Sequence, residues 1–309
     1  MTASLVCFAL AAATCSAQTV RLGVFGLFHP AELRLAADKG GALEVRAGAV
    51  SFVLRDGEAA TVALQDDGIE CRWRGGAARS RMVAASPQDG GLVLAVPRKL
   101  ERRFRGRLEI TVSKGALQPV VVMDIEVAVA SVVAAESPPG APIEALKAQA
   151  VVARSFYAAA HGRHAAFDFC DTTHCQFLRA APRAAEAAAR ATVATGGLVL
   201  AWHGVPVAAL YSARCGGRTR TPNRATPGDY PYFAVACPYC ARGPHRRAAA
   251  GHGIGLCQTG AAAMAADGAG FRAILEHYYP NTVLANTSAP NRDRQEAAFS
   301  TGASSTPRR

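Results

Sequence analysis

Long apolar runs, internal repeats and segments that interleave basic with aromatic residues are missing from nearly all of this 309-residue chain. After residue 17, no stretch reaches the roughly 18 uninterrupted apolar residues that a membrane-spanning helix needs, so we expect no transmembrane segment. The net charge is +11, but Arg and Lys are scattered, which argues against nucleic acid as the favoured partner. A polyanionic cell-wall or membrane surface would suit the same charge.

The first 17 residues are the exception, because they are almost wholly apolar and small. Cys15-Ser16-Ala17 resembles the small-x-small site at which signal peptides are cleaved. No Lys or Arg precedes the apolar run, so a buried N-terminal helix is the alternative interpretation. We predict a signal peptide over residues 1–17 and therefore an exported protein, located in the periplasm, in the cell envelope or outside the cell.

Cleavage at that site would leave seven of the nine cysteines, and six of these stand beyond residue 169. An exported protein is expected to oxidise clustered thiols or to bind a metal with them. The odd number leaves one cysteine over, most simply Cys71, which stands far from the others in the sequence.

The hydrophobic content of 50% is enough for a sizeable core, and the patterns predict an α+β fold. Short alternating or apolar stretches between Gly and Asp turns predict a β-rich N-terminal region over residues 18–105. A mixed α+β domain is predicted over residues 106–285, with helices near 143–160, 183–195 and 260–278 and a hairpin of 198–202 with 205–211. The tail, 286–309, has little to bury, and we predict that it is disordered.

The most specific stretch surrounds Glu136. An apolar run ends at this carboxylate, a Pro/Gly turn follows, and Pro142 stands where the first turn of a helix tolerates proline. Apolar residues then recur at spacings of 3, 4, 3 and 4, which predicts one stripe along a helix: Ile143, Leu146, Ala150, Ala153 and Tyr157. The pattern places Glu136 between two core elements, and an ordinary capping or surface carboxylate is the alternative.

A first cluster of metal-binding residue types follows this helix. His164, Cys170, His174 and Cys175 offer two imidazoles and two thiolates within 12 residues, which makes a plausible tetrahedral zinc set. A disulfide between Cys170 and Cys175, with unrelated histidines, is the alternative. With four protein ligands, a zinc ion would brace the loop and would not activate water.

A second cysteine motif, Cys237-Pro-Tyr-Cys240, has the spacing of a thioredoxin-type redox site. Such a motif belongs at a strand-to-helix turn near the start of a βαβ unit, whereas this one stands in an irregular segment. Together with Cys215 and Cys257, it more simply forms two disulfides or a second metal site. A Cys215 nucleophile with His252 as its base is a less favoured interpretation.

Five stretches, in this order along the chain, resemble the motifs of one family: Ala135-Glu136 with 144–155, then 170–176, 211–217, 251–255 with Gln258, and 276–282. The resemblance is to the SpoIID/LytB family (stage II sporulation protein D, amidase enhancer) and covers roughly residues 106–284. It implies a protein that binds peptidoglycan. The implied activity is that of a lytic transglycosylase on glycan strands stripped of their peptides, or the stimulation of a cell-wall amidase without catalysis. Some relatives carry zinc at the first cluster.

The resemblance gives Glu136 the role of the catalytic acid and base. Cleavage of a glycosidic bond needs a carboxylic acid that protonates the leaving oxygen, and an apolar surround raises its pKa enough to keep the proton. A hydrolase normally needs a second carboxylate. No second carboxylate stands in a comparable motif, although Asp171 is a candidate if water is the acceptor. In a lytic transglycosylase the 6-hydroxyl of the sugar attacks instead, and a 1,6-anhydro end results.

Further residues are predicted to bind the substrate. Lys147 and Arg154 are seven residues apart and share a helix face, so they are interpreted as binding the carboxylate of a muramic acid sugar, with a solvated helix face as the alternative. The other predicted members of the groove are Gln149, Tyr211, Ser212, His252 and Gln258. Tyr278 and Tyr279 are assigned to core packing. Only 11 residues separate Cys240 from His252, a shorter segment than the resemblance implies.

Overall fold

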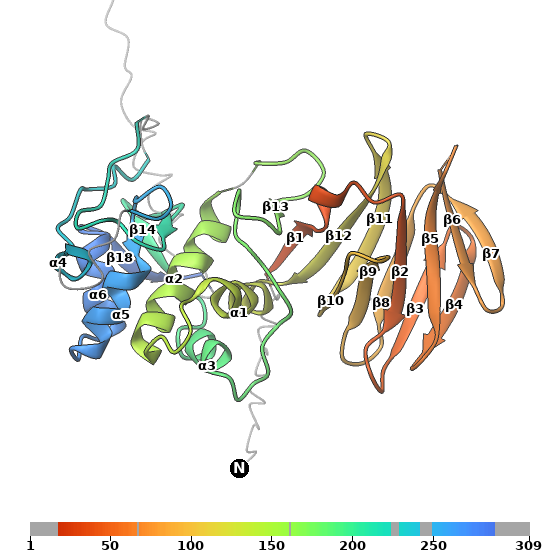
Figure 1. The fold of residues 1–309 in the computed structure, drawn as a ribbon, viewed down its shortest axis with the longest axis horizontal. Coiled ribbons are helices and arrows are strands. Elements are labelled where there is room, and N and C mark those ends of the chain that lie inside the picture. The colour runs from red at the N-terminus through yellow and green to blue at the C-terminus, as the bar shows by residue number, and fades with distance from the viewer. Residues whose placement is uncertain (1–17, 67, 161, 224–228, 242–248, 288–309) are drawn as a thin grey trace, which may run out of the picture.

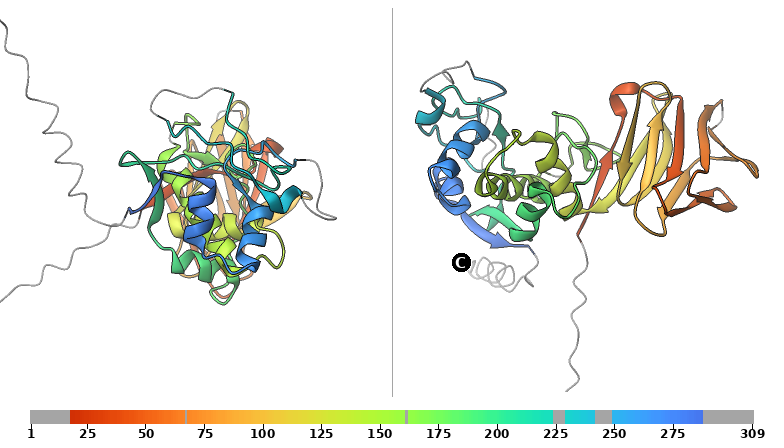
Figure 2. Two further views of the ribbon diagram at one scale, coloured as in Figure 1. Left: turned by 90° about the vertical axis from the view of Figure 1, so that its left-hand side faces the viewer. Right: turned by 60° about the horizontal axis from the view of Figure 1, so that its bottom comes forward.

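The computed structural model describes residues 18–66, 68–160, 162–223, 229–241 and 249–287. The predicted signal peptide, nearly all of the predicted tail and most of the short segment before His252 lie outside these ranges. The molecule is elongated, with strands at one end and helices at the other (Figures 1 and 2). The α+β fold predicted from the sequence is therefore confirmed.

The strand-rich end consists of two sheets, joined at one turn by the short 3-10 helix η1 (Gly26–Phe28). The first has the order β13-β1-β12-β11-β8-β3-β4, with β13 Phe169–Cys170, β1 Thr19–Gly23, β12 Ala116–Asp124, β11 Arg107–Ser113, β8 Val83–Pro87, β3 Ala42–Ala47 and β4 Val50–Arg55. The second has the order β10-β9-β2-β5-β6-β7, with β10 Leu100–Phe104, β9 Leu92–Val96, β2 Glu32–Ala37, β5 Ala59–Gln65, β6 Gly68–Trp73 and β7 Gly76–Ser80.

Alternation of residue types decides which face of these strands is buried. In β3, Leu43 and Val45 are fully buried while Glu44 and Arg46 between them are exposed, as the period of two along a strand requires. Such strands leave one apolar face each, and these faces pack together in one core. Cys71, the cysteine that we expected to have no cysteine partner, is buried in this core on β6.

The first sheet continues beyond residue 105. Strand β11 pairs antiparallel with β8, and β12 pairs antiparallel with both β11 and β1. β12 is apolar along nearly all of its nine residues and is buried on both faces, because helices cover the side that the second sheet does not. The chain thus passes from the sheet directly into the helices that carry Glu136.

Three helices pack together beside the first sheet, where α1 contacts β1 and β12 and the other two pack against α1: α1 (Ile125–Glu136), α2 (Ile143–Ala159) and α3 (Ala187–Ala194). Asp124 caps α1, because its Oδ1 accepts hydrogen bonds from the N–H groups of Glu126 at 2.8 Å and Val127 at 3.3 Å. The helix predicted from the apolar stripe is present as α2, and most of its residues are buried. α2 packs against α1 on one side and against the last helices on the other (Figure 1).

The C-terminal part contains short elements around α2. These are β14 (Leu198–Trp202), β15 (Val205–Pro206) and β18 (Val283–Asn286) in one sheet, β16 (Tyr211–Ser212) paired with β17 (Leu256–Cys257), and the helices α4 (Pro238–Ala241), α5 (Gln258–Ala266) and α6 (Phe271–Tyr278). The predicted hairpin of 198–202 with 205–211 is confirmed only at its turn, where β14 and β15 pair antiparallel. Its second strand is shorter than predicted, because Tyr211 pairs with Leu256 in another sheet. Tyr278 and Tyr279 are buried in the second core, as predicted. No helix in the described parts of the chain has the length and apolarity to cross a membrane.

One predicted helix is wrong. The sequence pattern predicted a single helix over 260–278, but the structure breaks it into α5 and α6 between Ala266 and Phe271. Gly268 has φ +94°, a conformation that L side chains rarely adopt, and it ends the first helix. Glu144 of α2 then caps the second helix, because its Oε2 accepts a hydrogen bond from Phe271 N–H at 2.8 Å.

Candidate functional site

Glu136 is the last residue of α1, and its half-buried carboxyl group lines a cavity of about 310 Å³. Burial raises the pKa of Glu136, while hydrogen bonds from the Tyr211 hydroxyl and the Phe177 backbone N–H oppose that rise. The carboxyl also stands at the negative end of the α1 dipole, which disfavours its charged form. Glu136 therefore keeps its proton to a higher pH than an ordinary glutamic acid does.

The cavity joins segments that are far apart in the sequence. α1 contributes Glu136, α2 contributes Phe156, and the rest of the wall comes from the loop after β13 and from the strands β16 and β17 with their neighbours. Four of the predicted substrate-binding residues lie in this wall: Tyr211, Ser212, His252 and Gln258. The remaining lining residues are Thr173, Cys175, Phe177, Ala209, Leu210, Ala213 and Gly251.

One wall of the cavity is formed by a two-stranded parallel sheet. Tyr211 pairs with Leu256 and Ser212 pairs with Cys257, so two motifs that are more than 40 residues apart meet there. Gly255 makes this pairing possible, because a Cβ at this position would lie 2.0 Å from Leu210 O. The Tyr211 hydroxyl oxygen also lies 3.1 Å from Gln176 Oε1, so its single proton serves either Gln176 or the Glu136 carboxyl.

Two buried amides lie behind Glu136. Gln258 Nε2 donates a hydrogen bond to the Glu136 backbone oxygen at 3.0 Å and lies 3.4 Å from Gln149 Oε1. Within the described residues, Gln149 Nε2 and Ser212 Oγ are buried without a hydrogen-bond partner. An unmet buried polar group costs about 1–3 kcal/mol, so Ser212 in the cavity wall is well suited to bind a ligand hydroxyl.

His252 stands in the cavity wall as a neutral side chain. Its Nδ1 accepts a hydrogen bond from the Ile254 N–H at 3.0 Å. Partial burial lowers the pKa of His252, and a hydrogen bond to the Tyr211 backbone opposes this effect. The imidazole can therefore contact a ligand through polar and stacking interactions without carrying a charge at neutral pH.

Arg154 does not reach the cavity, and the structure corrects the prediction that it binds substrate. Its side chain is fully buried, and Nε and Nη2 each donate to a Glu126 carboxylate oxygen at 2.6 Å. Nη1 donates to Leu198 O at 3.0 Å. Arg154 thus joins α2 to α1 and β14, and its donors are used inside the protein.

Lys147 is also directed elsewhere. Its Nζ lies 2.6 Å from Glu144 Oε1 and 6.0 Å from the centre of the Phe271 ring, and it is absent from the cavity lining. Lys147 and Arg154 do stand on one helical face, as the spacing of seven predicted. At one end of this face Lys147 pairs with Glu144, and at the other end Arg154 pairs with Glu126. Neither cation therefore lines the cavity.

Asp171 is not a second carboxylate for the same cavity. It is 4% exposed, and its Oδ2 accepts hydrogen bonds from Arg102 Nη1 at 2.8 Å and from Phe25 N–H at 3.2 Å. Both partners belong to the N-terminal region. Among the described residues that line the cavity, Glu136 is the only carboxylate.

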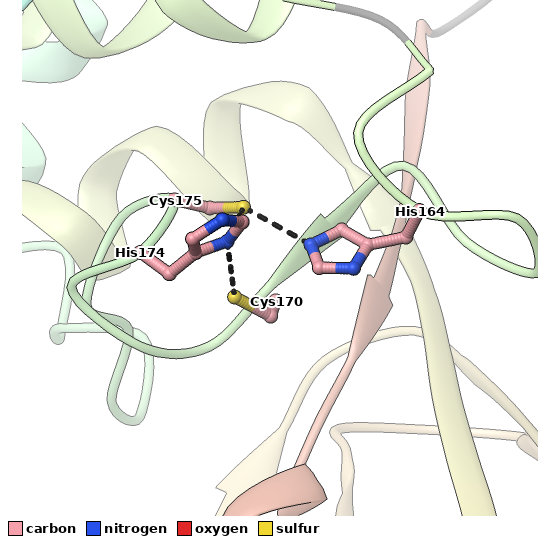
Figure 3. A group of neighbouring side chains, drawn as sticks. All are labelled: His164, Cys170, His174 and Cys175. Carbon is pink, nitrogen blue, oxygen red and sulfur yellow. Dashed lines mark hydrogen bonds between the residues drawn. The ribbon is translucent and has the colours of Figure 1, made fainter.

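The predicted metal ligands meet beside the cavity. The donor atoms of His164, Cys170, His174 and Cys175 all lie within 4.8 Å of one another, and the four side chains point toward a common centre (Figure 3). His164 Nε2 lies 3.3 Å from Cys175 Sγ, and His174 Nδ1 lies 3.7 Å from Cys170 Sγ. Two thiols and two imidazoles at such distances fit a tetrahedral zinc ion.

The loop that carries these four residues also forms one side of the cavity. Cys175 and Thr173 line the cavity, and Phe177 donates its N–H to Glu136 Oε1. The strand β13 ties the start of this loop to β1, with Cys170 opposite Gly23. A group that fixed the loop would therefore also fix the hydrogen bond to the Glu136 carboxyl.

Sequence reasoning missed three residues that shape this site: Glu126, Phe156 and Phe177. Glu126 has no motif of its own, and only the fold shows that it neutralises Arg154. Phe177 acts through its backbone N–H, so its side chain gives no signal. Phe156 stands directly before the last apolar residue of the predicted stripe on α2, and its cavity contact depends on tertiary packing.

A comparison with protein families agrees with this geometry. No curated protein matches the chain in a sequence search. Residues 113–202 match a family model described as SpoIID, stage II sporulation protein. The matched segment runs from the end of β11 to the end of β14 and includes Glu136, all of α2 and the His/Cys cluster. The match supports a cell-wall-related function, and over residues 113–202 it confirms the resemblance to the SpoIID family that the motifs indicated.

Proposed function

We propose that this protein is an exported lytic transglycosylase that cleaves peptide-stripped peptidoglycan strands with Glu136 as its single acid and base. The observation that carries the proposal is the isolation of Glu136 in its cavity. It has a raised pKa and is the only carboxylate among the described lining residues. One protonated carboxyl group suits a reaction in which the substrate supplies its own nucleophile, whereas hydrolysis normally uses two.

The proposed reaction has two proton transfers at the same carboxyl group. Glu136 first gives its proton to the glycosidic oxygen as the bond from that oxygen to C1 breaks. The resulting carboxylate then takes the proton of the sugar 6-hydroxyl while O6 forms a bond to C1. One end leaves as a free 4-hydroxyl, the other as a 1,6-anhydro sugar, and Glu136 is protonated again.

The neighbours of Glu136 have matching roles in this proposal. The Phe177 N–H is a backbone donor that stays with Glu136 Oε1 in both protonation states, which leaves the other oxygen to exchange the proton. Tyr211, Ser212, His252 and Gln258 offer neutral hydroxyl, imidazole and amide groups to sugar hydroxyls. Gln149 supports Gln258 from behind. None of these groups is a cation, so the cavity suits the uncharged part of the glycan.

The His164, Cys170, His174 and Cys175 cluster is proposed to hold a structural zinc ion. The donor set and its spacing fit zinc, and four protein ligands leave no position for a reacting water. The ion would supply rigidity to the loop. By fixing this loop, the four ligand residues would hold the Phe177 N–H in its hydrogen bond with the Glu136 carboxyl.

Zinc removal gives the first prediction. A chelator is expected to reduce glycan cleavage by loosening the loop, and added zinc should restore it, with zinc per chain measured in parallel. Substitution of Cys170 and Cys175 by serine should have the same effect without chelator. A zinc-dependent hydrolase would instead lose activity to the chelator and remain indifferent to Glu136→Gln.

The pH dependence gives the second prediction. The reaction needs protonated Glu136, so kcat should fall as pH rises through the raised pKa of this group. The alkaline limb is expected above the roughly 4.3 of an ordinary glutamic acid. Tyr211→Phe removes a hydroxyl that lowers the pKa of Glu136 and should move this limb to higher pH. A limb at the ordinary glutamic acid value would contradict the assignment.

A direct assay separates this proposal from the other function of the family. Purified peptide-free glycan strands and intact peptidoglycan are incubated with the chain, and soluble sugar products are measured. Release of short glycans from the peptide-free strands supports the proposal. Binding to the strands without any release, equal in wild type and Glu136→Gln, would identify a glycan-binding protein that stimulates a cell-wall amidase.

A further inference from the structure

Four cysteines from three separate segments meet inside the C-terminal part of the protein. Cys215 follows β16, Cys237 directly precedes α4, Cys240 lies within α4, and Cys257 ends β17. Their Sγ atoms all lie within 4.8 Å of one another, and all four residues are buried. No disulfide joins any cysteines in the described part of the chain.

We propose that these four cysteines form a second zinc site, distinct from the His/Cys cluster. A tetrahedral ion with Zn–S bonds of about 2.3 Å requires sulfur atoms about 3.8 Å apart. Cys240 Sγ and Cys257 Sγ lie 3.3 Å apart, and every other pair is within 4.8 Å. The two-residue spacing of Cys237 and Cys240 is that of one ligand pair in structural zinc sites. This proposal does not depend on the proposed enzymatic function.

Hydrogen-bond donors surround the sulfur atoms. Gly260 N–H donates to Cys257 Sγ at 3.4 Å, and the Tyr278 hydroxyl lies 3.4 Å from Cys237 Sγ. A Cβ at Gly260 would lie 2.6 Å from Cys237 Sγ and 2.0 Å from the Tyr278 oxygen. The absence of a side chain there lets α5 approach the sulfur atoms. Donors of this kind offset the negative charge of thiolates bound to zinc.

The part of the chain around the four cysteines has little regular secondary structure to stabilise it. Among the described residues between β14 and α5, the regular elements are strands of two residues and the four-residue α4, which gain little stability from their own hydrogen bonds. A bound metal supplies folding free energy where a small core cannot. The second core contains all four cysteines together with Tyr278 and Tyr279, so the ion would lie at its centre.

The same site would hold one wall of the Glu136 cavity. Cys257 directly precedes Gln258, whose Nε2 donates to the Glu136 backbone oxygen at 3.0 Å. Cys215 stands three residues after Ser212 of the cavity wall. The His/Cys cluster fixes the opposite side through Phe177. Each cluster thus secures a different side of the same cavity.

Burial argues against a redox or nucleophilic role for these thiols. Cys237 and Cys240 are 0% and 1% exposed, whereas a redox motif must expose a sulfur to its partner. Cys215 is 4% exposed and faces the other three sulfur atoms. It is therefore not placed as a nucleophile beside His252.

The test measures zinc and thiols in the full purified chain. Zinc per chain, determined by elemental mass spectrometry, should fall by one ion in Cys237→Ser/Cys240→Ser. It should stay unchanged in the control Cys71→Ser, which alters a buried thiol in the N-terminal core. An unchanged zinc content in the double variant would overturn the proposal.

Two further measurements leave the four cysteines of the second zinc site unchanged. X-ray absorption on Cys170→Ser/Cys175→Ser should show a remaining zinc with four sulfur ligands at about 2.3 Å. Alkylation of the wild-type chain, denatured with chelator and without reductant, should modify all four cysteines. Alkylation that finds these cysteines in two disulfides would contradict the site. So would an absorption spectrum in which no zinc ion has four sulfur ligands.

Discussion

Glu136→Gln is expected to reduce the release of glycan products by about 100- to 10,000-fold, the usual contribution of a general acid. Glutamine keeps the shape and can still accept the hydrogen bond from Phe177 N–H, but it cannot give a proton to the glycosidic oxygen. Product formation is measured as initial rate on peptide-free strands. Glu32→Gln is the matched control, because Glu32 is an exposed carboxylate on β2, in the sheet farther from the cavity.

The stability of this variant separates a functional role from a structural one. A carboxyl group whose folded-state pKa is raised favours folding while it is protonated. That contribution is lost as pH rises through the folded-state pKa. Glutamine stays neutral, so Glu136→Gln should unfold at the same or higher denaturant concentration than wild type above that pH. A variant that is both less stable and less active would mark Glu136 as a structural residue.

Arg154→Ala is expected to lower the free energy of unfolding by more than the roughly 1 kcal/mol of an exposed ion pair and by up to the about 3–5 kcal/mol of a buried pair, because it removes a buried cation and leaves the Glu126 carboxylate, which is 35% exposed, without its partner. The guanidinium is fully buried and meets Glu126 at two points and Leu198 O at a third. Urea unfolding of wild type and variant measures the loss. Arg154→Lys should recover only part of it, since an ammonium cannot make the paired contacts.

Lys147→Ala is the control on the same helix face. Its ion pair with Glu144 is partly exposed, and such pairs contribute about 0.3–0.5 kcal/mol. If Arg154→Ala instead unfolded within about 1 kcal/mol of wild type while glycan binding fell, Arg154 would regain the role in substrate binding that the sequence suggested. We use about 1 kcal/mol as the threshold because exposed ion pairs rarely contribute more than this to the free energy of unfolding.

Local sequence patterns predicted the helices and strands of this protein better than they predicted the tertiary contacts around them. The stripe on α2 located this helix to within one residue at its end, because apolar spacing follows directly from helix geometry. The same spacing placed Lys147 and Arg154 on one face. It could not show that α1 and β14 close over one end of that face, since those contacts join residues 28 and 44 positions away.

The candidate site shows the same division. Glu136, Tyr211, Ser212, His252 and Gln258 were predicted from motifs, and the structure brings these five around one cavity. The sequence left Cys215, Cys237, Cys240 and Cys257 open between disulfides and metal, because sequence spacing does not show whether four thiols converge on one point. Asp171 remained a possible second carboxylate until the fold placed it against Arg102.

The break between α5 and α6 was within reach of the sequence. Gly268 and Gly270 flank Ala269 directly after Asp267, and paired glycines of this kind end helices. The apolar residues on both sides continue the helical pattern, which is why the pattern alone predicts one helix. α1 gave the opposite difficulty, because a helix that is buried nearly all round lacks the periodicity that reveals a surface helix.

The isolation of Glu136 leads to the central claim, that the acceptor is a hydroxyl of the sugar and not water. The most direct measurement is mass analysis of the products that wild type releases from peptide-free glycan strands in water enriched in oxygen-18. The account predicts 1,6-anhydro ends that contain no heavy oxygen. Newly formed reducing ends, in products that are one molecule of water heavier than the 1,6-anhydro products, would show attack by water and would contradict the role assigned to Glu136.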